Sequence, residues 1–432
     1  MCVSAVEVEG LWNVNELRVP PKASWSLLKE KTVQTSNGPV IIKRGKVYFE
    51  GPEYNGKGTR IMAFFASPVG SGPFPSILLI HGGAGAAFSD WAELWASRGY
   101  VALAPDFCGH EVLAENFTEY DYSQQKYREK KERVPLENGG PGARGEDRFE
   151  PFTMMNNEYR NRWEWYATAA AIKSHALLDS LDQVDADKTA VTGISWGGYL
   201  ATLLAGIDQS FQVVVPVYGC GHLQDGSMWT QKELKAMSAA DRALWLACFD
   251  PSSTAAGVTS RILFVNGTND HAYPLNIHRK TCYDIAHSDI LLCNNLQHSN
   301  TNGWSPPEIE AYINSVLQNT NSLPLLEKPV VNYGKDKIEI SAKVKHNGQA
   351  TEATLFCGVC DDPGFVGGYD SNGKFHQVTW KEYPARIVNN CVVAEIPAGP
   401  DTGKLWAYLE ARNEQGLRGT THYIELESPT EE

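Results

Sequence analysis

The chain has 432 residues and carries 38 Lys and Arg side chains against 51 Asp and Glu, which gives a formal net charge of −13 at pH 7. A chain of this length predicts two or three domains. The acidic balance argues against nucleic acid and anionic membrane surfaces as partners. The sequence also lacks the run of about 18 apolar residues that a membrane-spanning helix needs. We therefore expect neither a nucleic-acid-binding nor a membrane protein.

The cysteines and the N-terminus bear on the compartment. Nine cysteines are scattered along the chain, which favours free thiols in a reducing compartment. Cys357 and Cys360 form a Cys-x-x-Cys pair, but no second pair stands at zinc spacing, so we expect no metal. No basic region followed by an apolar stretch opens the chain, so no export signal is visible. The sequence predicts a cytoplasmic location, or a secreted or periplasmic one if a leader was removed.

Residues 1–70 predict a β-rich lead-in. Two runs rich in β-branched and aromatic residues, 40–49 and 59–65, are separated by the pairs Gly51-Pro52 and Asn55-Gly56. Pairs of this composition mark turns, so we expect two antiparallel strands.

From residue 76 the chain alternates between apolar strands and amphipathic helices. The strands are expected at residues 76–80, 100–105, 189–194, 211–218, 261–266 and 289–293, and the helices at 89–97, 157–181 and from 305 onward. A Ser-Pro-Pro-Glu run at Ser305 predicts a capping box for the last helix. Alternating βα units predict an α/β fold with a doubly wound, mostly parallel sheet. The polar, glycine-rich excursion at about 108–155 is predicted to form a lid.

A second domain is expected at residues 324–432, after a catalytic domain at residues 1–323. Residues 337–345 alternate strictly between polar and apolar, and five more short runs follow with turn signals between them. This pattern predicts a small β-sandwich of the immunoglobulin-like kind.

The strongest chemical signal is Gly-Ile-Ser-Trp-Gly at residues 193–197, between a β-branched run and an Ala/Leu run. The pattern predicts a strand that turns sharply into a helix with Ser195 at the corner, where only flanking glycines leave room. The turn exposes the serine Oγ and places the Trp196 N–H where an oxyanion would develop. A glycine-rich turn with an incidental serine is the alternative.

A serine nucleophile needs a base and a carboxylate that orients it. Asp270 follows the strand at residues 261–266, and His298 follows the strand at 289–293, so the order serine, acid, histidine matches doubly wound hydrolases. We predict Asp270 as the acid and His298 as the base. Asp250 is a rival acid that we expect to cap a turn, and His271 is expected to be a loop side chain.

The second oxyanion donor is expected after the strand at residues 76–80, where His-Gly-Gly begins at His81. The Gly83 N–H is predicted to join that of Trp196. Trp91, Trp229 and His222 are candidates for substrate binding. The alternative for the tryptophans is a place in the core, and for His222 it is a bystander role.

These residues together resemble the α/β-hydrolase superfamily over roughly residues 60–320. Residues 195–199 look like the nucleophile turn of the prolyl oligopeptidase-type and the acetylxylan esterase/dienelactone hydrolase-type branches, and residues 81–95, 217–221 and 266–270 are similar to acetylxylan-esterase-like proteins. The resemblance implies a serine esterase that acts on acylated carbohydrate. A dienelactone hydrolase carries cysteine where Ser195 stands, and a prolyl oligopeptidase carries an N-terminal propeller that 70 residues cannot build. Both departures argue against those two activities.

The sequence thus predicts a serine carboxylic-ester hydrolase with a Ser-His-Asp triad, an acyl-enzyme and no cofactor. Its expected partner is a small-molecule or carbohydrate ester, and a homo-oligomer is left open. Two alternatives are a serine exopeptidase of prolyl oligopeptidase type and a non-catalytic binding protein on a hydrolase scaffold.

Overall fold

The computed structural model describes most of the chain, and within it two compact units. The described residues are 10–83, 86–113, 120–121, 126–127, 133–141, 152, 158–320, 323–345, 349–360, 368–369, 372–398 and 405–426. The first unit comprises Met1–Gly219, Met237–Arg261 and Ser299–Trp304, and the second comprises Cys220–Ala236, Ile262–His298 and Ser305–Glu432. Among the described residues, no helix combines the length and the apolar character needed to cross a membrane.

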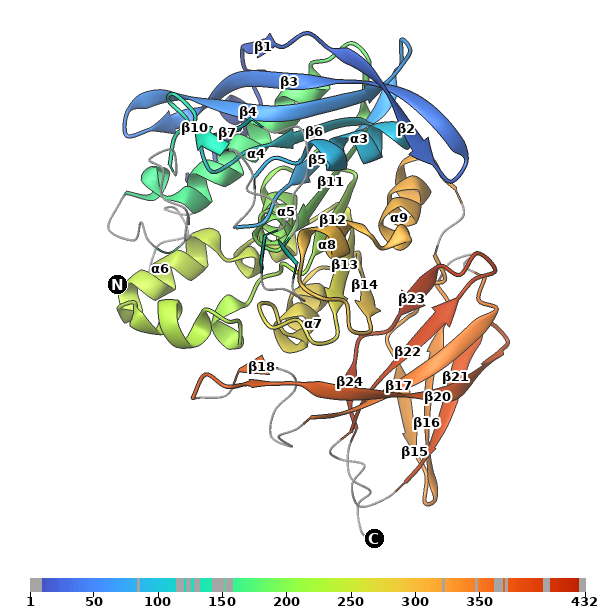
Figure 1. Ribbon diagram of the computed structural model, residues 1–432. Coiled ribbons are helices and arrows are strands. Elements are labelled where there is room, and N and C mark those ends of the chain that lie inside the picture. The colour runs from blue at the N-terminus through green and yellow to red at the C-terminus, as the bar shows by residue number, and fades with distance from the viewer. Residues whose placement is uncertain are drawn as a thin grey trace. The chain divides into compact units, whose positions relative to one another are not determined.

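The first unit is built on a mixed sheet whose central strands are parallel. Its strands lie in the order β1 (Ala23–Trp25), β3 (Gly38–Tyr54), β4 (Lys57–Pro68), β6 (Val101–Pro105), β5 (Phe74–Ile80), β11 (Val184–Ile194) and β12 (Val213–Val217), and β2 (Lys29–Thr35) pairs with β3. The pairs β6–β5, β5–β11 and β11–β12 are parallel, whereas β3, β4 and β6 pair antiparallel. This confirms the doubly wound core and its antiparallel lead-in (Figure 1).

The helices of the first unit are α2 (Val14–Leu17), α3 (Ser89–Ser97), α4 (Trp163–Asp179), α5 (Trp196–Ile207), α6 (Ala239–Phe249) and α8 (Asn300–Trp304). Three of them, α3, α4 and α5, lie where the sequence predicts helices, whereas α2, α6 and α8 were not predicted. The end of α3 is marked by Gly99, which adopts a φ of 95° that favours glycine. Helix α4 begins later than expected because Arg162 is extended and a short 3₁₀ turn, Tyr159–Asn161, precedes it.

One predicted turn of the lead-in is wrong. Strand β3 continues through Gly51-Pro52 to Tyr54, with an irregular register against β4 after Gly51. The chain reverses instead at Asn55-Gly56, where both residues have a positive φ (51° and 69°), as a tight hairpin turn requires.

Short strand pairs occupy the described parts of the 108–155 excursion. They are β7 (His110–Val112) with β10 (Arg133–Pro135) and β8 (Tyr120–Asp121) with β9 (Lys126–Tyr127). Most of the predicted lid lies outside the described residues and stays a prediction.

The second unit begins with a parallel pair, β13 (Arg261–Gly267) and β14 (Ser288–Cys293), joined by α7 (Leu275–Asp284). Helix α9 (Pro307–Leu317) follows, but the predicted capping box at Ser305 is wrong. Pro306 is the N-cap and makes no side-chain cap. The Glu308 carboxylate instead accepts a hydrogen bond from Arg418 Nε at 2.7 Å, so a partner remote in sequence takes the group that would have closed the box.

The C-terminal β domain, the strands that follow Pro324, forms one antiparallel sheet. Its order is β15 (Val330–Tyr333), β16 (Lys337–Lys343), β21 (Cys391–Pro397), β20 (Val378–Val388), β17 (Glu352–Cys360), β22 (Leu405–Arg412) and β23 (Arg418–Thr420), with β24 (Ile424–Glu425) on β22 and a separate pair of β18 (Gly368–Tyr369) and β19 (Phe375–His376). The antiparallel all-β character is confirmed. The domain boundary at residues 323 and 324 stays a prediction.

Strand β20 explains how a single sheet encloses a core. Its first part pairs with β17 and its last part, from Ala385, pairs with β21, so it belongs to both halves of the sheet. Side chains of both halves meet in one apolar cluster that includes Ile340, Val392, Leu355 and Leu409. A strand that changes partner at a corner is the usual way to fold one sheet over itself.

Candidate active site

Ser195 occupies the corner between β11 and α5, as the sequence predicts. Its φ of 59° and ψ of −118° lie in a region that non-glycine residues rarely adopt. The corner is held by the backbone, because Ser195 N–H donates to the Val217 carbonyl at 2.9 Å and the Ser195 carbonyl accepts from Tyr199 N–H at 2.9 Å. A strained serine at the end of a parallel strand is the geometry of a nucleophile elbow.

The two glycines of the motif are there because the backbone passes too close for a side chain. A Cβ on Gly193 would overlap the carbonyl group of Gly197, and a Cβ on Gly197 would overlap the carbonyl oxygen of Ile80 on β5. The Gly-x-Ser-x-Gly spacing is therefore a packing requirement of this strand–helix junction.

The loop after β5 lies directly against the corner. A Cβ on Gly82 would stand 3.3 Å from Ser195 Cβ, and a Cβ on Gly83 would overlap the Trp196 ring. His81 holds this loop: its Nε2 accepts from Phe107 N–H at 3.0 Å, so the ring proton is on Nδ1 and donates to the Gly82 carbonyl at 2.8 Å. The structure thus brings together the three residues predicted for attack and oxyanion binding, Ser195, Gly83 and Trp196.

An aromatic cluster supports the first turn of α5. The Trp196 ring lies 4.8 Å from Tyr199, 5.7 Å from Phe152 and 6.2 Å from Trp163, in edge-to-face arrangements. Phe152 belongs to the glycine-rich excursion, and no periodicity in that stretch marked it as a core residue. Its burial ties this part of the excursion to the corner.

A buried acid lies behind the cluster. Glu164 is fully buried, and its Oε1 accepts from the Trp245 indole N–H at 2.9 Å. Burial raises the pKa of Glu164 to about 7, although the hydrogen bond from Trp245 and the nearby Arg162 oppose that rise. Sequence reasoning missed this residue, because Glu164 and Trp245 stand 81 positions apart.

In the second unit, Asp270 and His298, the predicted acid and base, lie in hydrogen-bond contact, and their catalytic roles stay predictions. Asp270 Oδ2 lies 2.6 Å from His298 Nδ1, and Asp270 Oδ1 accepts from the N–H groups of Ala272 and Tyr273, both at 2.8 Å. Burial alone would raise the pKa of Asp270, but the charge and hydrogen bond of His298 and the Tyr273 N–H hold that pKa below its usual value. Asp270 is therefore a fixed carboxylate that orients the imidazole.

Two aromatic rings flank His298. The Tyr273 ring is parallel to the imidazole at 6.4 Å, and the His271 ring lies 5.5 Å away. Burial lowers the pKa of His271; the nearby Asp270 charge opposes this, and His298 adds to it. His271 is a loop side chain, as expected, and Asp250, the rival acid, accepts from Ser252 N–H and caps a turn, as expected.

The three candidates for substrate binding lie in different surroundings. Trp91 is 1% exposed and stacks on Trp304 at 5.3 Å, which agrees with the core alternative. Trp229 is half-buried, with its ring 5.1 Å from Tyr273. His222 Nε2 is 2.6 Å from an Asp284 carboxylate oxygen. The roles of Trp91, Trp229 and His222 stay predictions.

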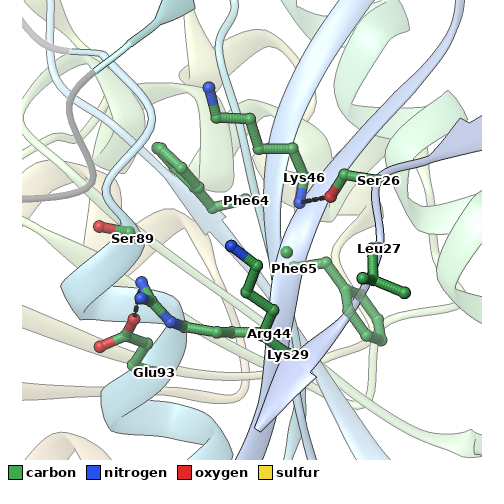
Figure 2. Close-up of a pocket in the computed structure, with 10 residues that line it drawn as sticks. Ser26, Leu27, Lys29, Arg44, Lys46, Phe64, Phe65, Ser89 and Glu93 are labelled. Atoms are coloured by element: carbon green, nitrogen blue, oxygen red, sulfur yellow. Dashed lines mark hydrogen bonds and ion pairs between the residues drawn. The ribbon is translucent and has the colours of Figure 1, made fainter. Parts of the chain in front are cut away.

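A pocket of about 300 Å³ on the first unit is separate from these residues. Figure 2 shows Lys29, Arg44 and Lys46 around Phe64, with the Arg44 guanidinium bound to Glu93 at 2.9 Å. None of the predicted site residues lines this pocket. Among the described residues, no three His, Cys, Asp or Glu side chains are grouped so as to hold a metal ion.

Comparisons with known proteins bear on the family and the fold. The model of the dienelactone hydrolase family matches residues 61–290. A curated relative, a probable dipeptidyl-peptidase 5 from Emericella nidulans, is 27% identical over 173 residues, which are 37% of this chain and 19% of the relative. The chain therefore spans about a fifth of that relative's length.

Two solved structures share the fold. An acetyl xylan esterase from Paenibacillus sp. R4 has a TM-score of 0.53 at 19% identity, covering 74% of this chain and 96% of that chain. Acetyl xylan esterase 1 from Thermoanaerobacterium sp. JW/SL YS485 has a TM-score of 0.51 at 17% identity, covering 71% of this chain and 93% of that one.

Proposed function

Because this chain belongs to the dienelactone hydrolase family, a family of hydrolases with the α/β-hydrolase fold, we propose that it is a serine carboxylic-ester hydrolase. The observation that carries the proposal is the strained Ser195 at the β11–α5 corner, with Gly83 and Trp196 against it. A serine in place of the family's cysteine directs the chemistry to a base-activated hydroxyl.

In the proposed mechanism, Ser195 Oγ attacks the acyl carbon while His298 Nε2 takes the hydroxyl proton. The carbonyl oxygen becomes an oxyanion that the N–H groups of Gly83 and Trp196 stabilise. The bond to the alcohol breaks, and His298 returns the proton to the leaving oxygen. Water then attacks the acyl-enzyme by the same route, with Asp270 holding the imidazole in the Nδ1–H tautomer in both halves.

For the substrate we propose an acetylated carbohydrate. The support is the residue resemblance at His81 to Trp95 and the fold shared with the two acetyl xylan esterases. The second candidate is a serine exopeptidase, which the dipeptidyl-peptidase relative favours. A non-catalytic protein on a hydrolase scaffold is the third.

The decisive experiment measures hydrolysis of a chromogenic acetyl ester by wild type, Ser195→Ala and Ser252→Ala. Ser252 belongs to the turn capped by Asp250 and serves as the matched control. We expect Ser195→Ala alone to lose activity and labelling by a fluorophosphonate. Equal rates for wild type and Ser195→Ala would refute the assignment of Ser195 as the nucleophile.

Substrate class is then resolved by kcat/KM across acetylated oligosaccharides, feruloyl and methyl uronate esters, and aminoacyl amides. We expect the acetylated oligosaccharides to rank first. Faster cleavage of the amides would favour the exopeptidase, and an unlabelled, inactive wild type would favour the binding protein.

A further inference from the structure

The loop that carries Asp270 is bonded to the C-terminal β domain through one side chain. Asn269 Nδ2 donates to the Val378 carbonyl at 3.1 Å, and Asn269 Oδ1 accepts from Val378 N–H at 2.9 Å. Both polar groups of the amide are thus used by one backbone unit, at the first residue of β20. A two-point bond of this kind fixes the orientation of the loop as well as its distance from the strand.

The same loop is also tied to the segment that leads to His298. Thr268 Oγ1 accepts from Asn295 N–H at 3.1 Å and donates to Asn294 Oδ1 at 3.3 Å. These residues follow β14, only a few positions before His298. Asp270 is therefore placed by a loop with two anchors, one within the hydrolase core and one on the β domain.

The charge of Asp270 also acts on a side chain of the β domain. Tyr369, on β18, is half-buried, and burial raises its pKa, with a further rise from the negative charge of Asp270. A phenol that senses this charge lies within its electrostatic reach. The bond to the acid loop itself is made at the start of β20, through Asn269 and Val378.

We propose that Asn269 is a positioning residue through which the C-terminal β domain holds Asp270 in register with His298. The inference rests on the proposed function, because it needs Asp270 and His298 to act as the acid–base pair. It gives the β domain a role in catalysis: the domain completes the support of the acid loop. Small misplacements of catalytic groups are costly, about 100-fold for an error near 1 Å.

The test compares kcat, KM and the pH profile of kcat/KM on a chromogenic acetyl ester for full-length variants. Asn269→Leu removes both bonds, and Val378→Pro removes the donor from the other side, at a strand's first residue where proline is tolerated. We expect each to lower kcat by about 10- to 100-fold with little change in KM. The double variant should lose no more than Asn269→Leu alone, because Val378→Pro removes one of the two bonds that Asn269→Leu already removes.

The pH profile separates positioning from simple destabilisation. In Asn269→Leu, Asp270 loses its anchor and stabilises the imidazolium of His298 less well. The acidic limb of the kcat/KM profile should therefore move to lower pH. Asn269→Asp keeps an acceptor for Val378 N–H and adds a negative charge, so it should retain more activity and move that limb to higher pH. Circular dichroism and the urea midpoint establish that each variant folds.

The matched control is Asn413→Ala. Asn413 Oδ1 accepts from the N–H groups of Gln415 and Leu417, so this change also removes two bonds to backbone, but in a turn between β22 and β23. It should leave kcat and the pH profile at wild-type values. Wild-type kcat in Asn269→Leu, or additive losses in the double variant, overturn the inference.

Ser195→Ala and Asp270→Asn in the same assay distinguish the two failures. If they lose activity while Asn269→Leu does not, only the positioning role is wrong. If they remain active, the proposed function itself is wrong.

Discussion

The turn around Ser195 and the loop around Asp270 are held by different kinds of contact. Ser195 is shaped by backbone packing, with Gly193 and Gly197 pressed against neighbouring carbonyl groups. Asp270 is held by hydrogen bonds from its own loop and, through Asn269, by the β domain 109 residues further along the chain. The Gly-x-Ser-x-Gly pattern of the first arrangement lies in five consecutive residues, although Gly197 packs against Ile80 of β5, whereas no local pattern marks the second. We therefore expect substitutions around Ser195 to act by steric overlap, and substitutions around Asp270 to act by misorienting the carboxylate.

The largest expected effect is on the acid side. Asp270→Asn should lower kcat by about 10⁴-fold, because an amide cannot stabilise the imidazolium and favours the wrong tautomer. The measurement is kcat on an acetyl ester at neutral pH. Asp250→Asn is the matched control, since Asp250 is equally buried and asparagine still caps its turn. Loss of activity in Asp250→Asn with retention in Asp270→Asn would reverse the assignment of the acid.

Substitutions next to the nucleophile should destabilise the fold by steric overlap. Gly197→Ala should lower the free energy of unfolding by more than about 4 kcal/mol, because its Cβ would overlap the backbone of Ile80, whose strand β5 is paired with β11 and β6. Urea denaturation measures the loss. Gly58→Ala is the control, since a Cβ there meets nothing within 4 Å. A stable Gly197→Ala variant would show that the corner is less tightly packed than the close approach of Gly197 to Ile80 indicates.

These two cases explain what the sequence could reveal. The positions of the core strands along the chain, helix α3 and the Ser195 corner depend on apolar runs and glycines that are neighbours in the chain, so they could be predicted. The Asp270–His298 pair could also be predicted, because chain order and strand ends restrict the candidates. The buried contact of Glu164 could not, since its partner Trp245 stands 81 positions away.

The error at Ser305 and the missed role of Asn269 have a common cause, which is that contacts remote in sequence outweigh local signals. The capping box at Ser305 does not form because Glu308 binds Arg418, 110 residues away. No local signal marks Asn269, because its partner Val378 on β20 lies 109 positions further along the chain. The error at Gly51-Pro52 is a different case, because the strand continues there through an irregular register against the neighbouring β4.

Glu164 is a buried acid near the aromatic cluster that supports the Ser195 turn, and its hydrogen-bond partner Trp245 is remote in sequence. Burial raises its pKa from 4.5 to about 7, so the folded state binds a proton that the unfolded state releases between these values. The carboxyl group therefore contributes stability below about pH 4.5 that is lost as pH rises towards 7. Glu164→Gln removes this loss, and we expect it to be more stable than wild type at pH 8 by at most about 3 kcal/mol, with little difference at pH 4.5. Urea denaturation at both pH values measures this, and a difference that does not change with pH would contradict it.

The smallest expected effect concerns the join between β14, which leads to His298, and β23 of the β domain. Thr420 Oγ1 accepts from Leu292 N–H at 2.9 Å and donates to the Ile290 carbonyl at 3.1 Å, whereas Thr421 Oγ1 accepts from Leu409 N–H at 3.0 Å within the β domain. Thr420→Val should cost about 2 kcal/mol, because it leaves a buried N–H and a buried carbonyl without their partner. Thr421→Val, which removes a bond of the same kind, should cost about half as much. Hydrogen exchange should accelerate at β14 in Thr420→Val alone. If it accelerates equally in both variants, the β domain stabilises the segment before His298 only through its overall folding. The contrast with the Ser195 turn would then rest on Asn269.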